Sequence, residues 1–183
     1  MANTASYVTT GKPKSTGGVW VAASGATLPT DATTALSSTY ACLGYISEDG
    51  LTMSTDMESD SIIAWGGDTV LTAQTGKTYT FTFTPVEVMN KEVWAAQFGS
   101  SNVTENNGKL TITGDTDEVK ACVFVFEIAM SDGGYMRIVV PSGKLSSLGD
   151  FSFNNSDPVG AEMEITALPS SGTSFTVYIA PGT

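Results

Sequence analysis

Residues 78–84 read Thr-Tyr-Thr-Phe-Thr-Phe-Thr, and this stretch decides the fold class. Side chains of a β-strand point alternately to its two faces, so the aromatic residues share one face and the threonines share the other. This period of two predicts a strand with one buried face and one polar face. We therefore expect Phe81 and Phe83 to be core residues.

Neighbouring segments follow the same logic. Residues 122–128 are apolar on both faces apart from Glu127, which is typical of a central strand. Asp-Gly-Gly at 132–134 predicts a turn into a second strand over 135–140. Asn-Asn-Gly at 106–108 tolerates positive φ and predicts a tight hairpin turn. The alternation adds three more residues to the predicted core: Phe124, Phe126 and Met163.

One segment indicates a helix. Thr84-Pro85-Val86-Glu87 combines an N-cap threonine, a proline at the first helical position and a glutamate three residues after the cap. Apolar residues then recur at helical spacing until Gly99, which provides a stop. These signals predict a helix over 85–98 with Glu87 in solvent. The predicted fold class is mainly β: a β-sandwich or barrel with one flanking α-helix.

Length and composition set the domain organisation. The chain has 183 residues, of which 41% are hydrophobic, enough for one domain with a core. Residues 1–16 are small and polar without periodicity, so we expect a flexible N-terminal arm followed by a single β domain over 17–183. No apolar run approaches the roughly 18 residues of a membrane span, and no signal peptide is visible. We expect no membrane partner and synthesis in a cytoplasm.

The chemical inventory is sparse. The absence of histidine excludes Ser-His-Asp catalysis, His-ligated zinc and His-ligated haem. Residues 115–118 begin like a calcium loop but lack the required glycine, because the sixth position is Lys120. Two cysteines cannot form a zinc site unaided. We therefore expect no catalytic residue, no metal, no cofactor and no enzyme activity.

Charge is distributed unevenly. The chain has 8 basic and 19 acidic residues and a formal net charge of −11. A nucleic-acid binder is expected to have the opposite charge balance, because it must neutralise phosphates. No basic residue occurs between Lys14 and Lys77. The polar segment 47–60 within this gap is expected to project as a loop or hairpin. It would meet a basic partner, repel a polyanion, or simply keep a surface soluble.

Several blocks of the sequence resemble the major tail tube proteins of bacteriophages with long, non-contractile tails. The most specific block is Gly-Tyr-Ile-Ser-Glu-Asp-Gly at 44–50. The resemblance covers most of the chain from about residue 15 onward. It is carried by residues 19–22, 28–32, 43–51, 63–70, 81–90, 151, 157–160 and 165–169.

The resemblance implies a structural virion protein of the phage tail, assembled in the host cytoplasm. It implies hexameric rings that stack into a hollow tube, through which the DNA genome passes without specific binding. The implied partners are further copies of the chain and the tape measure, tail tip and tail terminator proteins. An acidic lumen would repel DNA and keep it centred. Six residues are the candidates for ring-to-ring contacts or for the lumen: Glu48, Asp49, Asp56, Glu58, Asp60 and Asp68.

A second function remains open. A secreted carbohydrate-binding β-sandwich would use exposed aromatic side chains as sugar platforms, and Trp20, Trp65 and Trp94 are available. Such a module is expected to carry a signal peptide, which this sequence does not show.

Overall fold

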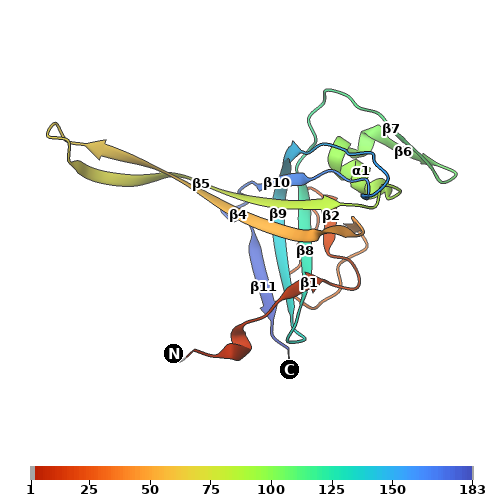
Figure 1. Ribbon diagram of the computed structural model, residues 1–183, viewed down its shortest axis with the longest axis horizontal. Helices are drawn as coiled ribbons and strands as arrows, with labels where there is room; N and C mark the ends of the chain where they lie inside the picture. The colour runs from red at the N-terminus through yellow and green to blue at the C-terminus, as the bar shows by residue number, and fades with distance from the viewer. Residues whose placement is uncertain (1–2, 183) are drawn as a thin grey trace.

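The computed structural model describes residues 3–182 and is mainly β, with one α-helix in that range. Figure 1 shows a body of crossing strands from which one long hairpin extends. In chain order the elements are η1 (Ala5–Tyr7), β1 (Gly11–Pro13), β2 (Val19–Ala23), β3 (Ala41–Cys42), β4 (Ile46–Ile63), β5 (Thr69–Pro85), α1 (Lys91–Phe98), η2 (Ser100–Asn102), β6 (Val103–Asn106), β7 (Lys109–Ile112), β8 (Cys122–Met130), β9 (Tyr135–Leu148), β10 (Met163–Ala167) and β11 (Thr176–Ala180).

A single antiparallel sheet forms the body. Its strand order is β3-β2-β8-β9-β10-β5-β4, while β1 pairs with β8 and β11 pairs with β9. Strand β9 joins two layers, because its first part pairs with β11 and its last part with β10. The strands β10, β5 and β4 cross over β2, β8 and β9 (Figure 1). The sheet thus folds over itself into the predicted sandwich.

The core lies between these two layers. Phe81 of β5 stacks on Phe126 of β8 with ring centroids 5.2 Å apart, and Phe83 contacts the same ring edge-on at 5.7 Å. All five residues that alternation assigned to the core are at most 2% exposed, including Phe124 and Met163. A second cluster on the other face of β8, around Val123 and Val125, explains why residues 122–128 are apolar on both faces.

The predicted start of the helix is wrong. Helix α1 begins at Lys91, where the Asn90 side chain accepts the Glu92 N–H at 3.0 Å. Pro85 instead completes β5, where it is buried and faces Ile46 of β4. Strand pairing therefore overrides the capping signal in the sequence. The predicted stop is confirmed, because Gly99 follows the last helical turn with a φ of 88°.

The two turns predicted at 106–108 and 132–134 are confirmed. Asn107 and Gly108 adopt positive φ values of 51° and 73° between β6 and β7. The turn over 132–134 joins β8 to β9, with Met130 accepting the Gly133 N–H. Both turns join antiparallel strands into hairpins, as the sequence indicates.

Candidate interaction surfaces

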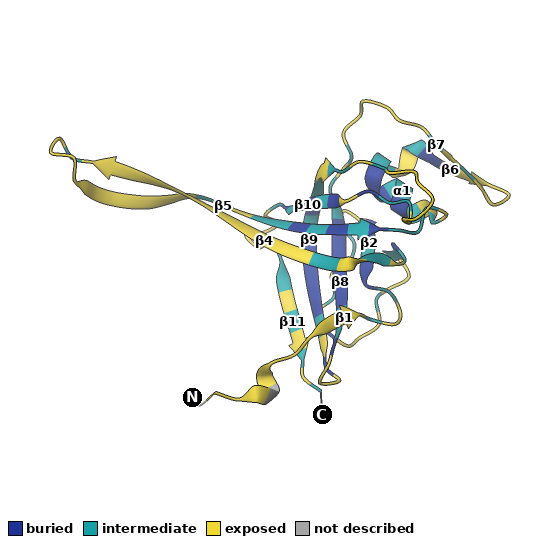
Figure 2. Ribbon diagram, viewed as in Figure 1, coloured by how far each residue is buried: buried dark blue, intermediate teal, exposed yellow. Residues whose placement is uncertain are grey.

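The hairpin of β4 and β5 leaves the body as an unsupported two-stranded ribbon. Strand β10 pairs with β5 only over 80–83, so beyond Tyr79 the two strands pair only with each other. Residues 55–63 of β4 extend this free part by about 30 Å at 3.3 Å per residue. Figure 2 shows it exposed along nearly its whole length. An isolated two-stranded hairpin is marginally stable in water, so this one is expected to gain stability from a partner.

The free hairpin carries its carboxylates on one face. Asp56, Glu58 and Asp60 alternate along β4 and lie opposite the uncharged residues Thr78, Gly76 and Ala73. An added Cβ at Gly76 would lie 2.9 Å from Glu58 Oε2, so the glycine leaves room for that side chain. We call Asp56, Glu58 and Asp60 the acidic face.

The cation of this hairpin lies on its other face. Lys77 pairs with Met57, and its Nζ lies 5.1 Å from the ring centroid of Tyr79. Within residues 3–182, the ion pairs join Glu127 to Lys14 and Arg137, and Glu118 to Lys144. The acidic face therefore takes part in none of them and repels itself along the strand.

The other predicted acidic residues lie at the two ends of the hairpin. Glu48 and Asp49 are exposed near the start of β4, beside an irregular register between Ile46 and Leu51. Asp68 is exposed in the turn between β4 and β5, where its carbonyl accepts the Ala64 N–H at 2.8 Å. The structure therefore spreads the six carboxylates along one hairpin rather than gathering them in a pocket.

The end of the hairpin is apolar. Trp65 is fully exposed, and the four large aliphatic residues beside it are each more than half exposed. Exposed apolar patches of this kind mark interaction sites in soluble proteins. We call these residues the apolar tip: Ile62, Ile63, Trp65, Val70 and Leu71.

A half-buried hydrogen-bond network fixes the root of the hairpin. Glu87 accepts the Tyr45 N–H at 2.9 Å and the Asn90 side-chain amide at 3.3 Å. Gly44 is required here, because its φ is 75° and an added Cβ would collide with the Glu87 carboxylate. The prediction that Glu87 lies in solvent is wrong, since the carboxylate is half-buried and holds the chain entering β4.

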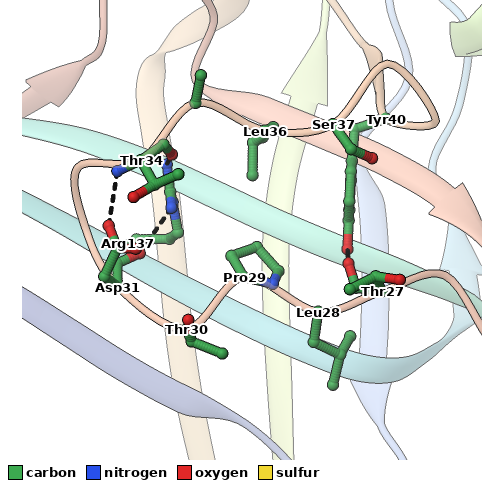
Figure 3. Close-up of a pocket in the computed structure, with 11 residues that line it drawn as sticks. Thr27, Leu28, Pro29, Thr30, Asp31, Thr34, Leu36, Ser37, Tyr40 and Arg137 are labelled. Carbon is green, nitrogen blue, oxygen red and sulfur yellow. Dashed lines mark hydrogen bonds between the residues drawn. The ribbon is translucent and has the colours of Figure 1, made fainter.

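On the body itself, residues 24–40 form a strap that covers one face of β8 and β9. Arg137 is 1% exposed and donates from Nη1 to the Asp31 carbonyl at 2.6 Å and from Nη2 to the Thr34 carbonyl at 2.7 Å. Tyr40 closes the strap by donating its hydroxyl to the Thr27 carbonyl at 2.9 Å (Figure 3). The pocket beneath has a volume of about 200 Å³.

The strap contains its own local stabilisation. The backbone N–H of Thr34 donates to Asp31 Oδ1 at 2.6 Å, and that of Thr33 donates at 2.7 Å. These bonds favour the ionised carboxylate and hold the pKa of Asp31 well below its ordinary value of 3.8, the Thr34 amide contributing most. Asp31 is thus a structural acceptor rather than a member of the acidic face.

Glu127 connects the strap to the N-terminal segment. Its Oε1 accepts from Arg137 Nε at 3.2 Å and from Lys14 Nζ at 3.3 Å. Lys14 follows β1, which pairs with the end of β8. The sequence contained a signal for the pair of Glu127 and Arg137, because a turn at 132–134 places these two residues opposite each other.

The side of the body that bears α1 carries an aromatic stack that the sequence analysis missed, in which Trp94, Phe98 and Phe151 are half-buried and Phe153 is exposed. Trp94 and Phe151 stack with centroids 5.4 Å apart and planes 10° apart, and Phe98 lies 5.9 Å from Trp94. Phe153 continues the row 6.4 Å beyond Phe151 and is 79% exposed. Trp94 is fixed by donating its indole N–H to the Val88 carbonyl at 2.7 Å. We call Trp94, Phe98, Phe151 and Phe153 the aromatic ladder.

The described residues do not assemble the other chemistry that the sequence left open. Within residues 3–182, no three acidic or cysteine side chains gather closely enough to hold a metal ion. The three tryptophans lie apart: Trp20 in β2, Trp65 at the hairpin turn and Trp94 in α1. They form no shared sugar platform. The same residue range contains no helix long and apolar enough to cross a membrane.

The fold is mainly β, and its free hairpin exposes an acidic face and an apolar tip. A family model described as "Phage tail tube protein" matches residues 1–183. The chain belongs to the phage tail tube protein family. A comparison with curated proteins finds no match. Membership makes the protein a structural component of the virion tail that self-assembles with other tail proteins.

Proposed function

We propose that six copies of this chain form a ring, and that the rings stack into a hollow tube that conducts the DNA genome into the host. The free β4–β5 hairpin carries the proposal, because an exposed ribbon of this length is expected to be stabilised by a neighbouring copy. The tape measure, tail tip and tail terminator proteins are the further partners, and assembly takes place in the host cytoplasm. The chain performs no catalysis in this role.

The acidic face fits a contact or lining surface of such a tube. Double-stranded DNA carries one negative charge per about 1.7 Å of axis, so a basic wall would bind it and slow its passage. Six copies at −11 each give a ring a formal charge of −66. A wall that includes Asp56, Glu58 and Asp60 repels the duplex, which stays centred and hydrated. In this proposal, Glu48, Asp49 and Asp68, at the two ends of the same hairpin, contribute to the ring junction or to the lumen.

The N-terminal segment has a place in the same proposal. Residues 1–16 act as an arm that is held to the body by β1 and by the Lys14–Glu127 pair. Residues 17–183 act as the tube-forming domain. Tyr7 and Val8 are both at least 80% exposed and are free to contact an adjacent copy.

Removal of the free hairpin tests the function directly. Replacing residues 59–75 by Asn-Gly joins Glu58 to its pairing partner Gly76 through a two-residue turn. The replaced residues are exposed apart from Ala64, so the body is expected to unfold at an unchanged temperature. Electron microscopy should show rings and tubes for the natural chain and none for this variant.

A matched control shortens the other exposed hairpin. Deleting Asn106 and Lys109, which face each other across the β6–β7 turn, leaves the Asn107-Gly108 turn intact. This variant should still form tubes. Tubes of normal diameter from the variant lacking 59–75 would refute a role of the hairpin, and a natural chain that never assembles would refute the proposed function.

A further inference from the structure

Two apolar surfaces, one exposed and one half-buried with a single exposed ring, lie far apart on this chain. The apolar tip is centred on Trp65, whose side chain is fully exposed and does not pack against the body. The aromatic ladder ends in Phe153, which is 79% exposed. Figure 1 places the hairpin tip at one end of the long axis and α1, which carries half of the ladder, toward the other end.

The geometry prevents the two surfaces from meeting within one chain. The free part of the hairpin carries the tip about 30 Å from the last residues that β10 supports. The hairpin also points away from α1 (Figure 1). Each copy therefore presents one tip and one ladder, and the tip and Phe153 stay in water until another copy binds.

We propose that the aromatic ladder is the receptor for the apolar tip of another copy of this chain. This inference deepens the proposed function, on which it rests, by naming the surface that receives the hairpin. A contact between two different surfaces of identical chains is heterologous, so it leaves one free tip and one free ladder after every addition. Such a contact can be repeated from copy to copy along an assembly, with each copy using one tip and one ladder.

The chemistry of the two surfaces matches. The tip offers one indole and four aliphatic side chains. The ladder offers the exposed ring of Phe153, stacked on a half-buried cluster of Trp94, Phe98 and Phe151. Tryptophan and other aromatic residues dominate the centres of protein interfaces, because they bury a large area with few rotatable bonds. The ladder needs little ordering on binding, since Trp94 is already fixed by Val88.

Disulfide trapping tests the contact. Both parent chains carry Cys42→Ala and Cys122→Ala, so that the introduced thiols are the only ones. One chain carries Trp65→Cys, and a second chain of different mass carries Phe153→Cys. Both positions are exposed, so neither substitution disturbs the core. After mild oxidation of the mixture, we expect the heterodimer joined through 65 and 153 to be the main cross-linked product.

A matched pair replaces Phe153→Cys with Ile179→Cys, which is also exposed and lies in β11, away from α1 (Figure 1). We expect at least a tenfold lower yield for this pair. Equal yields, or a product dominated by 65–65 dimers, would overturn the inference.

Electron microscopy of tubes formed by the same chains distinguishes a failure of this inference from a failure of the proposed function. If tubes form while the 65–153 product is absent, the receptor is wrong and the function stands. If the natural chain forms neither rings nor tubes, the function itself fails.

Discussion

Strand β5 lies in two different environments. Its second half, from Tyr79 to Pro85, pairs with β4, is also paired by β10 over 80–83, and buries Phe81 and Phe83 in the core. Its first half, from Thr69 to Thr75, pairs with β4 alone and is exposed. One continuous strand thus serves as core and as free ribbon.

The sequence of the strand carries this difference. The buried half alternates aromatic residues with threonine, so one face can enter the core. The free half, Thr-Val-Leu-Thr-Ala-Gln-Thr, offers no aromatic face and ends beside a register shift between Glu58 and Ser59. A bulge of this kind increases local twist and turns the ribbon away from the sheet. Support by a third strand, rather than strand propensity, decides which half is buried.

Truncation of one residue in each half should give the largest contrast. Phe81→Ala removes a ring that is 0% exposed and should lower the free energy of unfolding by about 3–5 kcal/mol. Leu71→Ala, in the free half, should change it by less than about 0.5 kcal/mol. Urea unfolding of both variants measures the two values. Similar losses would mean that the hairpin is packed against the body in solution.

The root of the hairpin should give the next largest effect, because it joins the two environments. Glu87→Ala removes the acceptor of the Tyr45 N–H and one of the two acceptors of the Asn90 amide, which also donates to the Cys42 carbonyl at 3.1 Å. The expected loss is about 1–3 kcal/mol of unfolding free energy, with faster hydrogen exchange at Tyr45. Glu105→Ala, at an exposed position of β6, is the control. An equal loss in both variants would show that Glu87 is no anchor.

The strap should show a smaller effect that depends on pH. The depressed pKa of Asp31 means that its ionised form stabilises the folded chain above the ordinary value of 3.8, and that this contribution disappears as the pH falls below it. Asp31→Asn removes the titrating group. The stability difference between natural chain and variant should therefore shrink between about pH 4 and pH 2, as measured by urea unfolding. A difference that stays constant over this range would contradict the role of the carboxylate.

Local patterns predicted much of this fold. Alternation at 78–84 and 122–128 located the core, and Asn107-Gly108 located a turn. The helix start failed because the signal at Thr84-Pro85 is local, whereas the pairing of Pro85 with Ile46 comes from a distant part of the chain. Long-range contacts of this kind are invisible to a capping rule.

The candidate surfaces show the same difference between local patterns, which the sequence reveals, and long-range contacts, which it does not. The carboxylates could be identified from a gap in basic residues, but their separation along a hairpin of this length could not. The strap was missed because Arg137 binds carbonyl groups of residues 31 and 34, which any sequence supplies. The aromatic ladder was missed because it joins α1 to a loop more than fifty residues later.

The acidic face should have the smallest effect on folding and a specific effect on assembly. The triple variant Asp56→Asn, Glu58→Gln and Asp60→Asn changes three exposed side chains, so the unfolding free energy should move by less than about 0.5 kcal/mol. Assembly is expected to respond because these carboxylates form no ion pair within residues 3–182 and would repel their counterparts in the proposed ring. Screening lengths fall from about 10 Å at 0.1 M salt to about 3 Å at 1 M.

The natural chain should therefore form tubes more readily at high salt, and the triple variant should form them equally well at low salt. Light scattering and electron microscopy over a salt series measure this dependence. The control variant Glu105→Gln, Asp117→Asn and Glu162→Gln makes the same change in net charge at exposed positions outside the hairpin. Because net charge alone would shift both variants equally, a salt dependence lost only in the first variant assigns the repulsion to the acidic face. Equal shifts in both would mean that Asp56, Glu58 and Asp60 serve solubility, as any exposed carboxylate does.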